Sequence, residues 1–386
     1  MDDTVKLLMH CIRFEIKGEP IPSELSDRIS FDVLKELFVL SKKHDLAHLT
    51  GAALEKNKLL TGGEIKKRFH KEIATAVYRF EQLNYEFNSV SETFENAKIP
   101  FMPLKGAVIR NYYPEPWIRT SCDIDILIHE EDIEKASAEL SEKLSYKREL
   151  KGAHDISFLT PAGMHIELHY DLIEEKVNDK SGQMLKNVWD NAYSEENSVR
   201  FYMTDETFYA YHLAHMAKHF VIGGCGVRPF IDLWILNNRV RCNAEKRQQC
   251  IRDAGLYEFE KTAVRLSKVW FENAKPDTLT DMMENFIISG GVYGSIKNRV
   301  AIQQRKKGGK FRYIMSRLFL PYSSLKYEYP VLEKHKWLFP FMEVRRWFRL
   351  LFNNKFKRSA QEMRINLSIS KQQQAENAKM LDLLGL

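Results

Sequence analysis

The chain has 386 residues, of which 44% are hydrophobic and 28% charged, and its net charge is +6. This content supports two or three compact units with hydrophobic cores and excludes a disordered chain. No apolar run reaches the roughly 18 residues of a membrane-spanning helix, and the opening Met1-Asp-Asp-Thr lacks the pattern of a secretory signal.

The cysteines give a further indication of the cellular compartment. There are five, an odd number, and they form no Cys-x-x-Cys pair. Such a set argues against a disulfide framework or a zinc-thiolate site and fits a reducing environment. We therefore expect a cytoplasmic protein.

Residues 1–98 are predicted to form an N-terminal helical region. Ser30 is expected to cap a helix whose apolar face includes Phe31, Leu34, Leu37 and Phe38. From Glu64 onward, apolar residues recur at alternating spacings of four and three, which predicts a long amphipathic helix with one buried stripe. The stripe consists of Phe69, Ile73, Ala76, Phe80, Leu83, Phe87, Val90 and Phe94.

Residues 99–175 are predicted to form an α/β core that begins with a possible phosphate-binding turn. Residues 99–104 indicate a short apolar strand, and Lys105-Gly106 then opens a helical segment from Ala107 to Tyr113. Free backbone N–H groups at the start of a helix favour phosphate oxygens. Lys105 adds a positive charge there, and Arg119 could supply a second cation. Taken alone, Lys-Gly is a weak signal, and an arginine is more often an ordinary surface residue.

The strongest signal in the chain is a pair of aspartates, Asp123 and Asp125, in the segment Cys122-Asp-Ile-Asp-Ile-Leu-Ile128. Alternation predicts a strand that projects both carboxylates from one face, where they could bind a hard divalent cation. Asp-x-Asp also occurs by chance in acidic loops, but isoleucine and leucine neighbours mark a buried strand, where unpaired carboxylates are costly. Glu167, in a second predicted strand, would lie beside them if the two strands are neighbours.

The remaining core elements predict a mixed sheet with helices on one side. Residues 130–144 form a predicted helix, and three strands are expected over residues 146–150, 154–159 and 164–170, with a turn at 161–163.

Residues 176–386 are predicted to form a C-terminal helical domain. His212, His215 and His219 share one face of a predicted helix over residues 207–220. This face could bind zinc, but without a neighbouring acid or cysteine a structural or substrate-facing role is the stronger expectation. The glycine-rich residues 223–226 follow a helix and lack a Lys-Ser/Thr ending, so we interpret them as a helix C-cap and turn.

The end of the chain is strongly basic. Residues 297–358 contain 17 lysines and arginines and three acids, a local charge of +14, so the remainder carries −8. Residues 336–352 interleave this charge with aromatic side chains. They could contact RNA by stacking, or lie on an anionic membrane surface as a basic amphipathic helix. The default interpretation is that the aromatic residues are core and the charges a solvated face.

The order of these motifs resembles the nucleotidyltransferase superfamily that includes DNA polymerase beta. The nearest resemblance is to a branch of uncharacterised bacterial nucleotidyltransferases, whose motifs run Lys-Gly, Arg, Asp-x-Asp, His and Glu-x-His. This chain offers matching residues at Lys105-Gly106, Arg119, Asp123, Asp125, His154, Glu167 and His169. Most of the wider superfamily carries Gly-Ser in the phosphate turn, whereas Gly106 is followed by Ala107 here.

The resemblance also extends beyond the α/β core. His215 and Lys218-His219 match a helix of the branch that is followed by an arginine and Asp-Leu, here Arg228 and Asp232-Leu233. We infer from this that the helix packs over the carboxylates and that its residues touch nucleotide or acceptor. Similar aromatic and basic segments, such as Leu320-Pro-Tyr322 and Tyr329-Pro330, occur at the end of the branch.

The resemblance implies an α+β fold with a small mixed sheet, flanked by N-terminal and C-terminal helical regions. It also implies transfer of a nucleoside monophosphate from a nucleoside triphosphate, ATP or another, to an acceptor that is a small molecule, RNA or protein. Asp123, Asp125 and Glu167 would act in catalysis by holding Mg²⁺ or Mn²⁺, with Glu167 an alternative base. Lys105, Gly106, Arg119, His215, Lys218 and His219 would bind the nucleotide. The alternatives are a metal-dependent glycosyltransferase that uses a nucleotide sugar and a non-catalytic RNA-binding protein.

Overall fold

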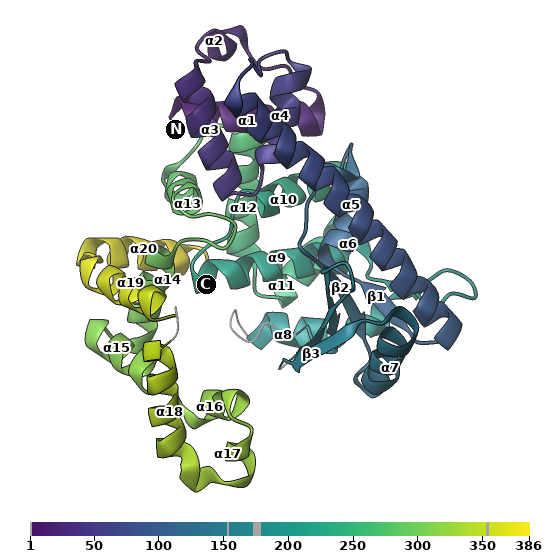
Figure 1. The fold of residues 1–386 in the computed structure, drawn as a ribbon. Coiled ribbons are helices and arrows are strands. Elements are labelled where there is room, and N and C mark those ends of the chain that lie inside the picture. Colours follow the sequence, from purple (N-terminus) through teal and green to yellow (C-terminus); the bar gives the residue numbers. More distant parts are fainter. Residues whose placement is uncertain (1, 153, 173–178, 353–354) are drawn as a thin grey trace.

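A computed structural model describes residues 2–152, 154–172, 179–352 and 355–386. A small sheet lies beside the long helix α5, with the first helices at one end of the molecule and the helices α15 to α18 extending away from it at the other (Figure 1). The expected α+β architecture, a mixed sheet flanked by helices, is confirmed.

The N-terminal region is helical as predicted. Its helices are α1 (Asp3–Lys17), α2 (Ser23–Ser26), α3 (Phe31–Lys43), α4 (Ala47–Lys56) and α5 (Glu64–Ala97). The Ser30 side chain caps α3 by accepting a hydrogen bond from the Val33 N–H. Of the predicted apolar face, Leu34 and Leu37 are buried, whereas Phe31, at the first helical position, is exposed.

Five strands form the predicted mixed sheet in the order β1-β2-β5-β4-β3. Strand β2 pairs in parallel with β5, and the other neighbours pair antiparallel. The parallel register sets Asp125 opposite Glu167 and Leu127 opposite His169. The strands are β1 (Phe101–Pro103), β2 (Asp123–Ile128), β3 (Lys147–Lys151), β4 (Asp155–Leu159) and β5 (His165–His169).

Helices cover one face of this sheet. The short turns η3 (Glu130–Asp132) and η2 (Pro116–Ile118) flank β2, and helix α7 (Ile133–Leu144) follows it. Alternate residues of β2, β4 and β5 pack with α5 and α7 in one apolar cluster, which includes Ile124, Ile126, Ile156, Phe158, Ile166, Leu168, Phe94 and Leu140. Because side chains alternate along a strand, the carboxylates of Asp123, Asp125 and Glu167 project from the opposite face.

The segment after β1 differs in detail from the prediction. Helix α6 begins at Lys105 and ends at Ile109, and the chain continues as a 3₁₀ turn, η1 (Arg110–Tyr112). A helix of five residues offers fewer aligned peptide dipoles than the helix expected over 107–113. Phosphate binding at this turn, which stays a prediction, would therefore depend more on side-chain charge than on the helix dipole.

The rest of the chain is almost entirely helical. A two-stranded ribbon, β6 (Tyr193–Ser194) and β7 (Phe201–Tyr202), lies between η4 (Val188–Asn191) and α9. The helices up to residue 307 are α8 (Asp179–Lys186), α9 (Asp205–Ile222), α10 (Arg228–Arg239), α11 (Ala244–Asp253), α12 (Tyr257–Glu272), α13 (Thr278–Ile288) and α14 (Ile296–Lys307). They are followed by α15 (Lys310–Leu318), α16 (Tyr322–Glu328), α17 (Val331–Lys334), η5 (Lys336–Leu338), α18 (Phe339–Phe352), α19 (Lys355–Ser368) and α20 (Lys371–Leu383).

The main hydrophobic cluster draws side chains from all three predicted units. It joins Leu8 of α1, Met102 of β1 and Trp270 of α12, among many others. The proposed boundaries at residues 98 and 175 stay predictions. Among the described residues, no helix is both long and apolar enough to cross a membrane.

Tyr146 connects the sheet to α5 by a buried polar contact, because its hydroxyl donates a hydrogen bond to Glu86. We expect Tyr146→Phe to lower the free energy of unfolding by about 2 kcal/mol, since the buried Glu86 carboxylate loses its donor. Urea denaturation measures this change. Tyr85→Phe, at an exposed neighbour on the same helix, is the matched control and should change stability by less than about 0.5 kcal/mol. Equal effects of the two substitutions would contradict the assignment.

Candidate active site

Two of the three predicted carboxylates, Asp123 and Asp125, border a cavity of about 280 Å³ between the open face of the sheet and α9. Lys105, Gly106, Arg119, Asp123 and Asp125 contribute to its wall from the core. The histidines of α9 and residues around Asp45, Arg228 and Tyr293 complete it. The residues that line it are His44, Asp45, Lys105, Gly106, Ile109, Arg119, Ser121, Cys122, Asp123, Asp125, Phe208, Tyr211, His212, His215, Met216, His219, Cys225, Gly226, Arg228, Pro229, Asp232, Val292 and Tyr293.

Asp125 is the centre of the site. Its Oδ1 atom accepts hydrogen bonds from Lys105 Nζ at 2.7 Å and from His169 Nε2 at 2.8 Å. Burial alone would raise the pKa of Asp125, but Lys105 and His169 hold it well below its usual range. Asp125 is therefore a buried carboxylate that stays ionised and is neutralised by two cationic groups.

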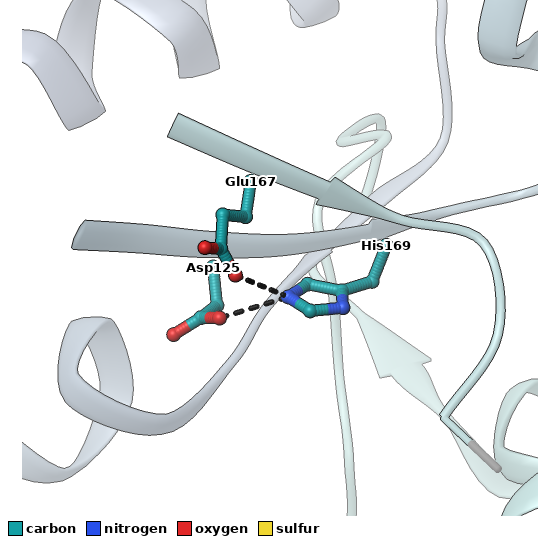
Figure 2. Close-up of side chains that lie close together, drawn as sticks. All are labelled: Asp125, Glu167 and His169. Carbon is teal, nitrogen blue, oxygen red and sulfur yellow. Dashed lines mark hydrogen bonds and ion pairs between the residues drawn. The ribbon is translucent and has the colours of Figure 1, made fainter. Parts of the chain in front are cut away.

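His169 belongs to the same cluster, although its place in the Glu-x-His motif predicts no individual role for it. Its Nε2 atom lies 3.4 Å from Glu167 Oε2 as well as beside Asp125, so it bridges the two acids (Figure 2). Burial lowers the pKa of His169, but its bonds to Asp125 and Glu167 outweigh this and raise it to about 9. The available signal was its position two residues after Glu167, which puts both side chains on one face of β5.

Asp123 lies at the start of β2, on the same face as Asp125. Burial raises the pKa of its carboxyl, and the neighbouring charge of Asp125 raises it further. Two carboxylates this close favour a bound cation, because a cation relieves both their desolvation and their mutual repulsion.

Three residues have ligand atoms within 4.8 Å of one another and could hold a metal ion: Asp125, Glu167 and His169. Two carboxylates suit Mg²⁺ or Mn²⁺, and the imidazole nitrogen, once it has lost the proton that it donates to the acids, suits Mn²⁺ or another transition metal. The donor set therefore fits a divalent cation without specifying which one. It differs from the predicted set by including His169, and the place of Asp123 in it stays a prediction.

Lys105 adopts an unusual backbone conformation at the start of α6. Its φ of +41° lies in the left-handed region, which costs a non-glycine residue roughly 1–3 kcal/mol. Such a conformation persists only where surrounding contacts impose it, and here the ion pair with Asp125 fixes the side chain. In this state Lys105 neutralises a carboxylate, and its predicted phosphate contact requires an exchange of partner.

Gly106 is closely surrounded by polar groups. A Cβ atom at this position would lie 3.2 Å from Ser121 Oγ and 3.3 Å from both Arg110 Nη2 and Arg119 Nη1. Arg110, which the sequence did not single out, donates to the Gly106 carbonyl and to Ser121 Oγ. Arg110 thus holds the turn that follows β1, and Arg119 lies beside it.

Arg119 already has a carboxylate partner. It forms two hydrogen bonds with Asp232 of α10, Nε to Oδ1 at 3.1 Å and Nη2 to Oδ2 at 2.8 Å. Tyr113 also donates to Asp232, and Arg228 pairs with Asp45. Asp232 therefore holds the segment before β2 in place, whereas Arg228 binds the turn after α3, and phosphate binding by Arg119 stays a prediction.

The histidines of α9 line the cavity as expected of a helix over the site. His215 and His219 lie one helical turn apart, with their Nε2 atoms 3.1 Å from each other, and His212 contacts the Pro229 carbonyl. Burial and the charge of Lys105 lower the pKa of His215, so its ring is neutral. Three predicted residues are not among the described residues of the cavity wall, namely His154, Glu167 and Lys218. His154 pairs with Asp171 at 3.5 Å.

A comparison with protein families supports the identity that this geometry suggests. The model of a family described as an uncharacterised nucleotidyltransferase matches residues 34–272, which is more than half of the chain. The match spans the sheet and α9 to α12 and ends before the basic C-terminal segments. Comparison with curated proteins gives no significant match, and comparison with solved structures gives none either. This match shows that the chain belongs to the family of uncharacterised nucleotidyltransferases, and the carboxylate-bearing sheet agrees with it.

Proposed function

We propose that the protein transfers a nucleoside monophosphate from a nucleoside triphosphate to an acceptor in the cytoplasm. The acceptor oxygen forms a bond to the α-phosphorus, the bond from this phosphorus to the bridging oxygen breaks, and pyrophosphate leaves. One observation carries the proposal: the parallel pairing of β2 and β5 sets Asp125 opposite Glu167 on the open face of the sheet. The family match supports this reaction over sugar transfer or RNA binding without catalysis.

The carboxylates of Asp123, Asp125 and Glu167 would hold the divalent cation, Mg²⁺ or Mn²⁺. When bound, this cation supplies charge neutralisation for the triphosphate and for the charge that develops on the leaving group. Glu167 is the less enclosed of the two paired acids, with 31% of its side chain exposed. This exposure suits it to its alternative role, in which it accepts the proton of the acceptor hydroxyl instead of binding the cation.

The cationic groups would bind the phosphates. Lys105, with its partner Asp125 engaged by the cation, would exchange that carboxylate for a phosphate oxygen. The turn at Gly106 would place backbone beside the phosphates, with Arg119 supporting it, while His215 and His219 would contact nucleotide or acceptor from α9. Stabilisation of this kind acts on charge that develops during the reaction.

The proposal predicts label transfer from at least one nucleoside triphosphate. We expect the purified protein, incubated with each α-labelled triphosphate, Mg²⁺ or Mn²⁺ and either total tRNA or a cell extract, to label an acceptor with one nucleotide in preference to the others. Equilibrium dialysis with Mn²⁺ tests triphosphate binding without requiring the acceptor. Failure of both transfer and binding for all four nucleotides would refute the proposal, and preferential binding of a UDP-sugar would support a glycosyltransferase instead.

A further inference from the structure

Helices α15 to α18, residues 310–352, are called the C-terminal arm here. They extend away from the sheet and from the first helices (Figure 1). The arm begins well after residue 272, where the family match ends. Nothing in the proposed reaction uses it, so its surface requires a separate explanation.

Helix α18 turns its apolar face towards water. Phe341, Val344 and Phe348 recur at spacings of three and four, which places them on one face, and Phe341 and Phe348 are 61% and 58% exposed. Trp337, one turn earlier in η5, is also exposed. Single exposed apolar residues are common, but an aligned stripe of this kind marks a contact surface.

Helix α15 also has an apolar face that is exposed to solvent. Phe311, Met315 and Leu318 have spacings of four and three, share one face, and are all exposed, whereas Tyr313 on the other side is buried. Phe319, just beyond the helix, packs edge-on against Trp347 of α18, with ring centroids 5.3 Å apart. The two helices therefore lie against each other, and each keeps an apolar stripe in solvent.

The inner sides of these helices combine apolar and polar contacts, since Phe339 and Met342 of α18 pack on a small apolar cluster of α16 and α17. Glu343 and Arg346 of α18 form a buried ion pair, and the Glu343 carboxylate also accepts a hydrogen bond from the Leu320 N–H. Tyr313 donates to Glu362 of α19. The default interpretation of residues 336–352, with aromatic core and charged exterior, is therefore wrong for Trp337, Phe341 and Phe348, which are exposed, but Phe339 does pack on an apolar cluster. The burial of the Glu343–Arg346 ion pair fixes the helix with the exposed stripe outwards.

The charge of this region indicates what covers the stripes. Residues 310–352 contain nine lysines and arginines and three acids, so the arm itself carries +6. Arg345 is exposed next to Val344, so positive charge borders the apolar face of α18. A helix with a Phe-rich and Trp-rich apolar face and basic flanks suits the boundary between lipid headgroups and acyl chains. An anionic bilayer attracts each such charge within a Debye length.

We propose that the C-terminal arm binds an anionic membrane surface through the exposed stripes of α15 and α18. A second copy fits the arm less well, because two arms would bring like charges together. RNA also fits less well, since Met315, Leu318 and Val344 offer neither stacking nor hydrogen bonds to bases. The proposal is independent of the reaction and concerns only where the enzyme is held.

Flotation of the full-length protein with vesicles tests the proposal. We expect binding to vesicles of phosphatidylcholine mixed with phosphatidylglycerol, weaker binding to phosphatidylcholine alone, and loss of binding as salt increases. Phe341→Ser combined with Phe348→Ser should weaken binding at least about tenfold, because each burial of a phenylalanine side chain contributes on this scale. Trp337 fluorescence should shift to shorter wavelength on binding.

The matched control is Tyr78→Ser combined with Tyr85→Ser, a pair that is 63% and 71% exposed on α5 and should leave vesicle binding unchanged. Circular dichroism and the melting temperature check that both variants are folded. The proposal is overturned by equal binding of the two vesicle types, or by unchanged binding of the phenylalanine variant. It is also overturned if the full-length protein does not bind vesicles and the phenylalanine variant instead loses dimerisation or salt-sensitive RNA binding.

Discussion

Asp125→Asn is expected to lower nucleotidyl transfer by roughly three orders of magnitude. The carboxylate is the shared partner of Lys105 and His169, and it lies opposite Glu167 in the sheet. An amide of the same shape lacks the negative charge that a divalent cation requires. The measurement is the initial rate of label transfer at saturating metal and nucleotide, normalised to folded protein.

Glu167→Gln separates catalysis from folding. Asp125 is buried, so its replacement also leaves Lys105 and His169 without a counter-charge and lowers stability. Glu167 is partly exposed and contacts only His169 among the site residues described above, so its amide variant should fold normally and still lose most of the activity. Comparable loss in both variants supports a shared metal-binding role.

Glu131→Gln provides the matched control, because Glu131 is an exposed acid in η3, the turn that follows strand β2. It should retain the full rate. Normal activity in folded Asp125→Asn or Glu167→Gln protein would exclude these carboxylates from the reaction and leave the cavity without a catalytic centre.

Local patterns predicted the elements of the core and the face on which the acids lie. Alternation in residues 122–128 and 164–170 identified both strands, and the spacing of Asp123 and Asp125 set them on one face. These features depend only on the period of two along a strand. The parallel pairing that brings Glu167 to Asp125 was a condition of the prediction, and the structure meets it.

Partners that are distant in sequence could not be predicted in the same way. Arg119 and Asp232 are 113 residues apart, and both were noted, yet nothing in the pattern indicated that they bond to each other. Ion-pair partners depend on how helices pack around the core, which periodicity does not encode. His169 was missed as a possible ligand for a related reason, because its link to Asp125 exists only once β5 lies beside β2.

Periodicity also could not predict which face of the helices in the C-terminal arm is exposed. It indicates that α18 has an apolar face but not whether another element covers that face. The outward direction of Phe341 and Phe348 follows from the buried Glu343–Arg346 pair, which is a tertiary feature.

Asp232→Asn should destabilise the protein by roughly 3–5 kcal/mol, the largest expected effect on stability. Asp232 is fully buried, and Arg119 and Tyr113 both donate to it. Burial raises the pKa of Asp232, but Arg119 outweighs this and holds it below its usual value, so the carboxylate is ionised. The substitution leaves the Arg119 guanidinium desolvated without a counter-charge, and urea denaturation measures the loss.

A double substitution tests whether Arg119 also binds phosphate. Arg119→Met with Asp232→Leu removes both charges and should recover part of the stability lost by Asp232→Asn, because no unpaired charge remains. If Arg119 contacts the triphosphate, this more stable variant should still bind nucleotide about tenfold more weakly by equilibrium dialysis, as expected for a lost charged hydrogen bond. Unchanged affinity would instead limit Arg119 to holding the segment before β2, and Lys105 would then be the principal cation for the phosphates.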